Sequence, residues 1–330
     1  MLNHIISQKP EYLILDNVFG NLDTVAQADI QQTLAYLGRS LPIIQITNRK
    51  DDILSFIDKT YQLLDGIPVE FNHSNSFDKK ESLTFLEALP KPYKVVSEQI
   101  NPLVKFNHVT VVYRDRTILK DISWEINKGE FWQLIGPNGS GKSTILSMVF
   151  GDNPKAYGQD ITLFGVKKGS GESVWDIKEK IGYFSSEMLR GFKRSDSIGN
   201  MIVSGFFDSM GLYRTPTDAQ IKIAHQWLNV LQMFDIRKQP FLSLSNGYQR
   251  LVLIARAMVK QPPLLILDEP TNGLDDADAK LFVELINKIA SETDTAILYV
   301  SHRKEAGLKP GFVYELIPNK SGSTGKQVKV

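Results

Sequence analysis

The hydrophobic pattern alternates between short apolar runs and longer segments with helical periodicity. Apolar runs of strand length occupy five segments: residues 131–135, 161–164, 181–184, 264–268 and 296–301. Apolar positions recur at helical spacing in three further segments: residues 218–231, 248–259 and 277–290. Alternation of this kind predicts an α/β fold in which helices cover a mainly parallel sheet.

Three segments do not follow this alternation. Residues 103–135 predict short strands separated by turns, with strands at 109–113 and 122–126. Residues 187–244 contain no strand candidate and predict a mainly helical insertion. Residues 66–102 contain four prolines and predict a linker that carries one helix near residues 79–89.

An internal repeat links the two ends of the chain. The sequence LILD occurs at residues 13–16 and again at residues 265–268, 252 positions later. Two further matches follow at nearly the same spacing: residues 22–23 with 274–275, and residues 46–50 with 300–304. Two similar buried strands can also arise by coincidence, but an ordered series favours a repeat. On that interpretation, residues 1–65 are the last part of a first copy.

A glycine-rich loop follows the apolar run at residues 131–135 and precedes a helical run at residues 145–150. It fits the pattern G-x-x-x-x-G-K-[ST] and consists of Gly136, Pro137, Asn138, Gly139, Ser140, Gly141, Lys142, Ser143 and Thr144. Backbone amides of such a loop surround phosphate oxygens at the positive end of the following helix. Lys142 would reach the β- and γ-phosphates, and the Ser143 hydroxyl would bind Mg²⁺. A chance glycine-rich turn is the alternative, but strand, loop and helix together predict a nucleoside triphosphate site.

Two carboxylates follow the apolar run at residues 264–267. Asp268 would hold Mg²⁺ through water beside Ser143, and Glu269 would polarise the water that attacks the γ-phosphate. An acidic pair after a strand is also compatible with a solvated loop or a helix N-terminus. The phosphate loop earlier in the chain favours the catalytic interpretation.

The sequence LSNGYQR at residues 244–250 resembles the signature motif of ATP-binding-cassette (ABC) ATPases, usually LSGGQ. Asn246 stands for the first glycine of that motif. The resemblance implies that Ser245, Asn246 and Gly247 contact the γ-phosphate of ATP bound to a facing cassette. Ser245 can at the same time be an ordinary helix N-cap.

The same resemblance assigns roles to three further residues. His302 matches the switch histidine that contacts the γ-phosphate and holds the catalytic glutamate, and Asp275 lies in the D-loop that touches the opposing cassette. Tyr113 occupies the place of the aromatic residue that stacks on adenine. A histidine after a strand is usually incidental and a strand aromatic usually packs in the core, so these roles depend on the order of the other motifs.

The sequence departs from the family pattern in three places. The glutamine that normally follows the strand at residues 181–184 is replaced by Ser185-Ser186-Glu187, which leaves open whether Ser186 or Glu187 substitutes for it. In the first copy, Asn17 replaces the glutamate that matches Glu269, and Asn48 replaces the histidine that matches His302. An amide cannot act as a base, so the first copy is expected to be catalytically poor.

The resemblance therefore implies a P-loop NTPase ABC cassette, with a mainly parallel sheet, an N-terminal antiparallel β-subdomain and a helical subdomain. The expected organisation is a partial, degenerate cassette at residues 1–65, a linker at 66–102, a complete cassette at 103–318 and a tail at 319–330. Within the family the chain resembles the soluble tandem-cassette proteins known as molybdenum-transport or photorepair ATP-binding proteins. The segments that favour this subgroup are residues 129–132, 204–209 and 300–305.

The composition indicates in which cellular compartment the protein is expected. Hydrophobic residues make up 42% of the sequence, and no apolar run is long enough to span a bilayer. The N-terminus lacks the features of a signal peptide. The chain contains no cysteine, which fits a reducing compartment, and its net charge of +1 argues against strong binding of nucleic acid. We therefore expect a cytoplasmic protein, with a peripheral place at the inner membrane as the alternative.

The leading hypothesis is an ATPase that binds ATP and Mg²⁺ and hydrolyses ATP when two cassettes pair. The partner cassette is either a second copy of the chain or the missing half of the first copy. One alternative is the energising subunit of a membrane transporter, with molybdate as a candidate cargo. Another is an ATP-dependent binding switch that does not hydrolyse ATP. The residues themselves name no cargo.

Overall fold

The computed structural model describes residues 2–20, 22–64, 66–71, 85–92, 100–191, 196–302 and 304–330. The chain divides into two compact units. The first contains Met1–Thr84 and Gly273–Ala277, and the second contains Phe85–Asn272 and Asp278–Val330. Within the described residues, every helix is too short or too polar to cross a lipid bilayer.

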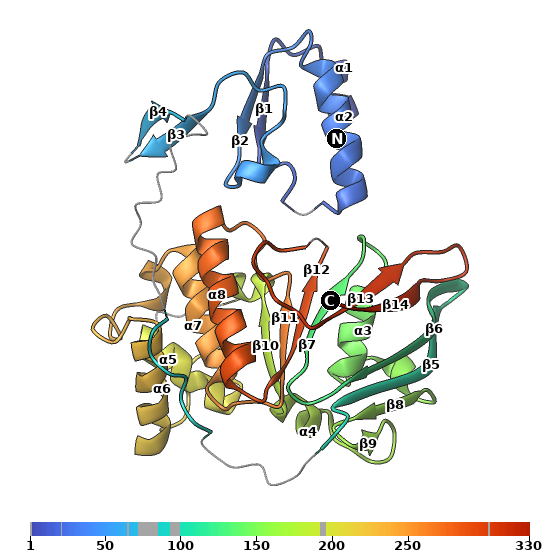
Figure 1. Ribbon diagram of the computed structural model, residues 1–330, viewed down its shortest axis with the longest axis vertical. Helices are drawn as coiled ribbons and strands as arrows, with labels where there is room; N and C mark the ends of the chain where they lie inside the picture. Colours follow the sequence, from blue (N-terminus) through green and yellow to red (C-terminus); the bar gives the residue numbers. More distant parts are fainter. Residues whose placement is uncertain are drawn as a thin grey trace. The chain divides into compact units, whose positions relative to one another are not determined.

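The second unit is built on a six-stranded sheet with the order β10-β11-β12-β7-β13-β14 (Figure 1). All neighbouring strands are parallel except β13 and β14. The strands are β7 (Phe131–Ile135), β10 (Ile181–Ser185), β11 (Leu264–Asp268), β12 (Ala296–Ser301), β13 (Phe312–Ile317) and β14 (Thr324–Lys329). Four of the five apolar runs expected to form strands, residues 131–135, 181–184, 264–268 and 296–301, lie in this sheet and are mostly buried, as expected for parallel strands covered by helices. The fifth run, residues 161–164, instead contributes to β8 (Asp160–Leu163) of an antiparallel sheet.

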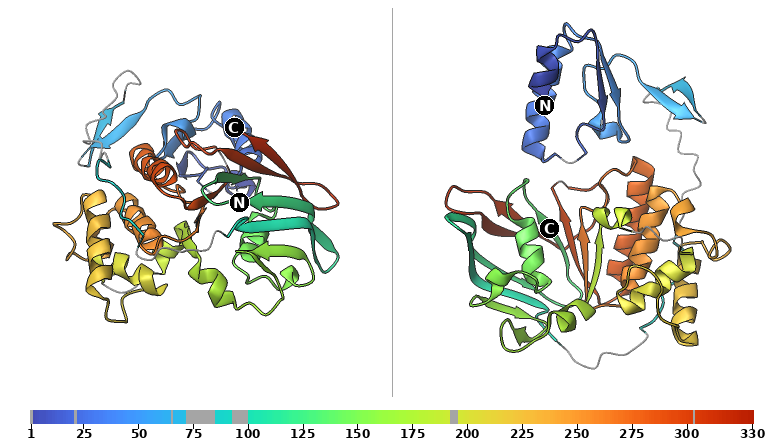
Figure 2. Two further views of the ribbon diagram at one scale, coloured as in Figure 1. Left: turned by 60° about the horizontal axis from the view of Figure 1, so that its bottom comes forward. Right: turned by 180° about the vertical axis from the view of Figure 1, so that it is seen from behind.

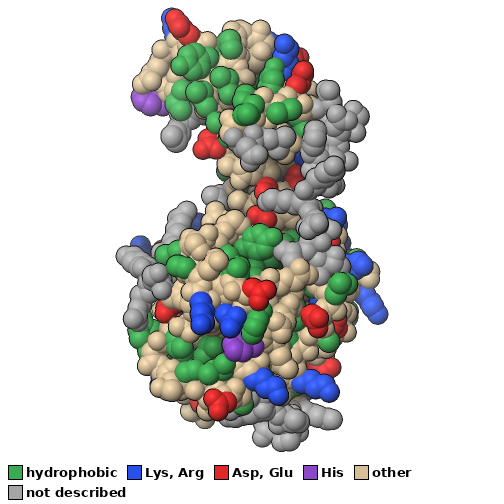
Figure 3. Space-filling model, turned by 90° about the vertical axis from the view of Figure 1, so that its left-hand side faces the viewer, with side chains coloured by type: hydrophobic (Ala, Val, Ile, Leu, Met, Phe, Trp, Pro, Cys, Tyr) green, Lys and Arg blue, Asp and Glu red, His purple; other side chains and the backbone are tan. Residues whose placement is uncertain are grey.

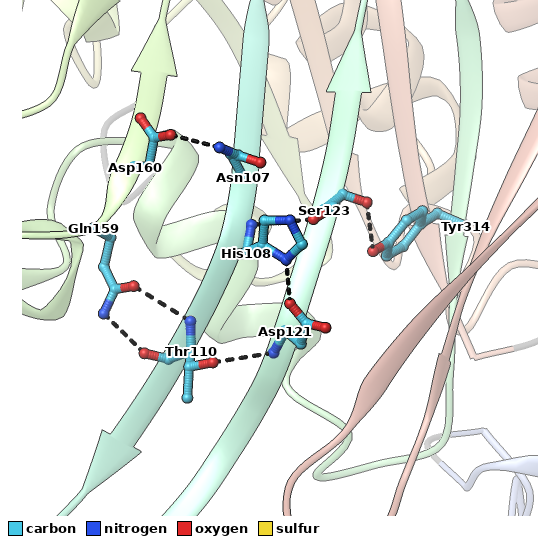
Figure 4. Close-up of polar contacts among 8 residues, drawn as sticks. All are labelled: Asn107, His108, Thr110, Asp121, Ser123, Gln159, Asp160 and Tyr314. Atoms are coloured by element: carbon cyan, nitrogen blue, oxygen red, sulfur yellow. Dashed lines mark hydrogen bonds and ion pairs between the residues drawn. The ribbon is translucent and has the colours of Figure 1, made fainter.

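An antiparallel sheet with the order β6-β5-β8-β9 packs on the other side of helix α3 (Lys142–Val149) (Figures 1 and 2). Its strands are β5 (Val104–Tyr113), β6 (Arg116–Ile126), β8 (Asp160–Leu163) and β9 (Val166–Lys167). Polar side chains fasten β5 to its neighbours, with His108 bound to Asp121 on β6 and Asn107 bound to Asp160 on β8 (Figure 4). His108 and Asp121 both have positive φ, at 52° and 56°, next to the register shifts that bend this sheet.

The expected helical insertion is present, and residues 196–244 contain no named strand. It includes α5 (Ile198–Val203), the 3₁₀ turns η4 (Ser204–Phe207) and η5 (Phe241–Ser243), and α6 (Asp218–Val230); the 3₁₀ turn η3 (Ser186–Arg190) and helix α4 (Val174–Glu179) precede it. On the face that carries α5 and α6, acidic and basic side chains are interspersed with small hydrophobic groups (Figure 3). That face has no extended surface of one charge.

The insertion is fastened to helix α7 (Asn246–Met258) by the segment at residues 204–209. Arg256 donates hydrogen bonds to Ser204 Oγ (3.1 Å) and to the Ser209 carbonyl (2.8 Å), and Lys260 pairs with Asp208 at 2.7 Å. A Cβ at Gly205 would overlap the Arg256 carbonyl, so glycine is required for this approach. Residues 204–209, with the sequence SGFFDS, therefore anchor the helical insertion to α7.

Among the described residues of its N-terminal segment, the first unit forms two small sheets and two helices. Strands β1 (Leu13–Asp16) and β2 (Ile43–Ile46) are parallel, and β3 (Tyr61–Leu64) and β4 (Ile67–Glu70) form an antiparallel hairpin. Helix α2 (Thr24–Leu37) contributes to a core of Leu13, Leu15, Phe19, Leu34 and Leu54; α1 (Leu2–Ser7) and the 3₁₀ turn η1 (Lys50–Asp52) complete the unit.

Two segments differ from their sequence-based description. Residues 319–330, expected to be a tail, contain β14, which pairs with β13 along its whole length. The strand sequence TGKQVK has almost no apolar alternation, so its pattern gave no signal. Strand β4 lies within the expected linker at 66–102. Most of the helix expected near residues 79–89 falls outside the described residues, and residues 85–92 contain no helix.

A buried ion pair fixes the connection between β9 and α4. Lys168 Nζ lies 2.9 Å from Glu172 Oε1, and the two side chains are 0% and 7% exposed. The amides of Gly169 and Ser170 also donate to the Glu172 carboxylate, at 2.9 and 3.0 Å. Burial alone would raise the pKa of Glu172, but the Gly169 and Lys168 contacts outweigh it and hold that pKa at about 2.

We expect Glu172→Gln to destabilise the protein at neutral pH. A carboxylate whose pKa is lower in the folded state stabilises that state above its ordinary value of 4.5 and loses the effect as the pH falls toward 2. The loss at neutral pH should be about 1–2 kcal/mol after allowance for solvent screening. Thermal unfolding at several pH values checks this, with exposed Glu179→Gln as the control. An equal loss at neutral and acidic pH would contradict the assignment.

Candidate nucleotide-binding site

The residues expected to act on a nucleotide follow strands that end at the same edge of the six-stranded sheet. Ser185 of β10 is in register with Asp268 of β11, which is in register with Val300 of β12. Ser301 of β12 is in register with Ile135 of β7, directly before the phosphate loop. The carboxyl ends of adjacent parallel strands are the usual ligand-binding edge of such a sheet.

The phosphate loop has a backbone that requires glycine. Gly139 and Gly141 have φ values of 77° and 102°, in the left-handed region. A Cβ at Gly141 would also lie 2.6 Å from Leu119 Cδ2, so β6 packs directly against the loop. Lys142 is buried at the start of α3, and its Nζ donates to the carbonyls of Gly136 (2.6 Å) and Pro137 (3.3 Å).

The loop fits a phosphate group. Ser140 Oγ is buried and has no hydrogen-bond partner within the described structure, and a Cβ at Gly139 would meet no other atom within 4 Å. Thr144 lies in the first turn of α3, where helix amides and the helix dipole favour an anion. A buried hydroxyl, open space beside a glycine and a helix N-terminus together suit phosphate oxygens.

Asp268, one of the two expected magnesium ligands, lies where its charged form is disfavoured. Burial raises the pKa of its carboxyl to about 6, the Glu269 carboxylate adds to the rise, and the Lys142 ammonium opposes it. The described residues contain no group of three or more His, Cys, Asp or Glu suited to a metal. Mg²⁺ needs no such group, because one carboxylate, the Ser143 hydroxyl, phosphate oxygens and water are a usual ligand set.

Glu269 and His302 are in direct contact. His302 Nδ1 lies 2.9 Å from Glu269 Oε2, and His302 is buried whereas the Glu269 side chain is 21% exposed. Glu269 has a φ of 46°, and its amide donates to the Val300 carbonyl at 2.9 Å. A glutamate in the left-handed region is strained, and such residues are frequent at active sites. In this backbone conformation the Glu269 carboxylate contacts His302.

The signature sequence lies at the N-terminus of α7. Ser245 occupies the N-cap position, but its side chain makes no capping hydrogen bond, so its hydroxyl is not used by the first turn of the helix. A Cβ at Gly247 would overlap the carboxyl group of Asp278 on helix α8 (Asp276–Glu292). Gly247 is therefore needed for packing as well as for access to the helix amides.

Comparison with known proteins agrees with this geometry. A family model described as ABC transporter matches residues 119–272. The ABC transporter ATP-binding protein ModF of Escherichia coli (strain K12) is 40% identical over 92% of this chain and 65% of ModF. The zinc uptake system ATP-binding protein ZurA of Listeria innocua is 35% identical over 62% of this chain and 77% of ZurA. The chain belongs to the ABC ATPase family.

Solved structures show the same fold. One of them is cbiO1 from Clostridium perfringens, which is part of an ABC transporter complex. The structural match covers 69% of this chain and 88% of cbiO1, with a TM-score of 0.59 and 24% sequence identity. The chain spans only 65% of the length of ModF.

In this ABC ATPase the loop after Glu269 is fastened to the signature helix. Arg250 of α7 is buried and donates to the carbonyls of Pro270 and Asn272. Asp275 follows in the segment Gly273–Ala277, which groups with the first unit. Arg250 was assigned no role in the sequence analysis, since hydrogen bonds between residues 20 positions apart leave no local pattern.

Residues 185–187, which replace the family glutamine, end β10 and begin η3. Ser185 is buried beside Asp268 in the sheet register, and Glu187 is exposed. The Glu187 charge contributes to the raised pKa of Asp268, after burial and Glu269. A carboxylate next to the expected metal site is thus a feature of this chain.

Asn17 of the first unit has the backbone conformation and the amide contact of Glu269. It has a φ of 44°, and its amide donates to the Ile46 carbonyl at 2.9 Å, as that of Glu269 does to the Val300 carbonyl. The Asn48 amide donates to Asn17 Oδ1 at 3.3 Å. The first unit therefore repeats the backbone geometry at Glu269 with an amide in place of the carboxylate.

Proposed function

We propose that the chain binds Mg-ATP at residues 136–144 and hydrolyses it when its cassette faces a second cassette. The contact between Glu269 and His302, at the sheet edge that also carries the phosphate loop, is the observation that carries this proposal. Members of this family hydrolyse ATP, and positioning with charge neutralisation accounts for most catalysis of phosphoryl transfer.

Each side chain has a distinct task in this proposal. Lys142 exchanges its two loop carbonyls for β- and γ-phosphate oxygens, and Ser140 gains a phosphate partner for its buried hydroxyl. Asp268 and Ser143 hold Mg²⁺, which supplies charge neutralisation when it is bound.

Glu269 accepts a proton from the attacking water, and His302 holds its carboxylate in place. The water oxygen bonds to the γ-phosphorus as its bond to the β–γ bridging oxygen breaks and ADP leaves, and Lys142 compensates the negative charge on the phosphate oxygens. Tyr113 offers its half-exposed ring to the adenine base.

We infer that a second cassette completes the binding site of the γ-phosphate. The start of α7 presents the hydroxyl of Ser245 and the backbone amides of Asn246 and Gly247, which together can bind an anion. This anion site lies outside the phosphate loop of the same cassette. By the resemblance to ABC ATPases, Asp275 also contacts the opposing cassette. The partner is a second copy of the chain or a completed first copy.

We also infer that residues 1–65 are the C-terminal part of a first cassette. An apolar residue of strand β1 is exposed where its equivalent is buried, with Ile14 at 54% against Ile266 at 0%. In the second unit β7 lies between β12 and β13, whereas β2 and β3 belong to separate sheets. The exposure and the separate sheets support a sheet that lacks the strand equivalent to β7.

The relatives support a second candidate function. ZurA is named as the ATP-binding protein of a zinc uptake system, so this chain is a candidate energising subunit of a membrane transporter, including one for molybdate. The replacement of the family glutamine by residues 185–187 favours the permease-independent ATPase. Co-purification with a multi-span membrane protein would favour the transporter.

The absence of cysteine supports a place in the cytoplasm.

Phosphate release measured against protein concentration tests the proposal. If cassettes must pair, the rate per chain should rise with concentration and then level off, because each site needs the signature of its partner. A background rate at every concentration would instead support an ATP-dependent switch that does not turn over.

A further inference from the structure

A chain of hydrogen bonds joins Tyr113, at the end of β5, to the phosphate-loop helix α3. The Tyr113 Oη lies 3.0 Å from Asn153 Nδ2 and 3.1 Å from Asn153 Oδ1. Asn153 Nδ2 also donates to Ser147 Oγ at 2.9 Å, and Ser147 Oγ donates to the Thr144 carbonyl at 2.8 Å. Thr144 is the last residue of the phosphate-loop sequence, so the chain runs from an aromatic ring to the phosphate site.

The side chains joined by these hydrogen bonds differ sharply in burial. Asn153 is 3% exposed, and its Oδ1 also accepts from the Lys155 amide at 2.9 Å at the start of the 3₁₀ turn η2 (Pro154–Ala156). Tyr113 is 39% exposed, so its hydroxyl is held by a buried group while part of its ring faces solvent. A buried amide with satisfied partners is rigid, and an aromatic ring with an anchored polar tip offers a fixed apolar face.

The segment that carries Asn153 is itself fastened to β5. Gln159 Nε2 donates to the Thr110 carbonyl at 2.8 Å and Gln159 Oε1 accepts from the Thr110 amide at 3.3 Å, and Asn107 donates to Asp160 at 2.6 Å (Figure 4). The backbone of this segment thus follows β5, and Asn153 makes the last contact before the strand ends.

We propose that Asn153, with Ser147, is a positioning residue for nucleoside recognition. It fixes the separation between the Tyr113 ring and the phosphate loop, so that a purine base stacks on the ring while its phosphates lie at Lys142. The inference rests on the proposed function, which assigns the ring to the base and the loop to the phosphates. Without Asn153 the ring must be ordered by the ligand itself, which weakens binding.

Asn153→Ala tests the proposal in the full chain with Mg²⁺. The Kd and KM for ATP should rise about 5- to 10-fold, as expected for one or two lost hydrogen bonds, with kcat at saturation unchanged. The Kd for inorganic tripolyphosphate should not change, since this ligand has no base. Asn107→Ala, which removes a contact of the same segment away from Tyr113, is the control and should leave both ligands unaffected.

A double-mutant cycle shows whether Asn153 acts through the ring. Tyr113→Phe removes the hydroxyl and should weaken ATP binding by a similar factor, and adding Asn153→Ala to Tyr113→Phe should cost little more. Thermal unfolding of each variant shows whether the fold is retained. Tyr113→Leu should abolish the effect of Asn153→Ala altogether.

Two outcomes overturn the inference and leave the proposed function intact. One is equal weakening of ATP and tripolyphosphate by Asn153→Ala, which would make Asn153 a support of the phosphate loop. The other is a full effect of Asn153→Ala in the Tyr113→Leu background. If the unaltered chain binds neither ligand, the proposed function and the inference both fail.

Discussion

Glu269→Gln is expected to reduce the rate of ATP hydrolysis by about 10²- to 10⁴-fold, the usual contribution of a positioned general base. Glutamine has nearly the same shape and retains an oxygen that can accept from His302, whose Nδ1 lies 2.9 Å from the carboxylate. It cannot accept a proton from water. The Kd for Mg-ATP should therefore change little. Steady-state phosphate release and equilibrium binding of ATP are the two measurements.

A matched control separates loss of the base from loss of charge. Glu315→Gln makes the same change on β13, at an exposed position of the same sheet, and should leave turnover unchanged. Hydrolysis by the Glu269→Gln protein at the parent rate would exclude Glu269 as the base. Weaker binding with normal turnover would place Glu269 among the binding residues.

Lys142→Ala is expected to weaken binding of Mg-ATP by about 10- to 100-fold, because hydrogen bonds to charged groups contribute about 1.5–3 kcal/mol. Lys142 is buried at the start of α3, and its ammonium group is held by the carbonyls of Gly136 and Pro137, in the loop that would receive the phosphates. Equilibrium binding of a fluorescent ATP analogue gives the Kd.

The control for this variant is Lys167→Ala, which removes an exposed lysine from the same unit and should leave the Kd unchanged. Thermal unfolding without nucleotide should show that Lys142→Ala remains folded. An unaltered Kd in Lys142→Ala would mean that the phosphates do not bind at this loop.

Fully buried elements were predictable from the sequence. Strands β7, β11 and β12 appear as continuous apolar runs because helices cover both faces of the sheet, and α6 and α8 show the periodicity of one buried face. Helix α7 was also expected, although nearly all of its residues are buried. Strand β14 was missed because its sequence is polar and its stability depends on pairing with β13. Local pattern indicates burial, and β14 is an exposed edge strand.

The site was predictable where it depends on motif order. The resemblance to ABC ATPases predicted the contact of Glu269 with His302, and the structure shows it. Asn153, Arg250 and Asp278 were not predicted to matter, since each acts through a partner distant in the sequence. An asparagine before a proline looks like ordinary turn chemistry until the fold places Tyr113 beside it.

The matching backbone of Glu269 and Asn17 has a consequence for the stability of the two segments. Both residues adopt the left-handed conformation, which asparagine tolerates far better than glutamate. Position 269 therefore carries a conformational cost in free energy that position 17 largely avoids.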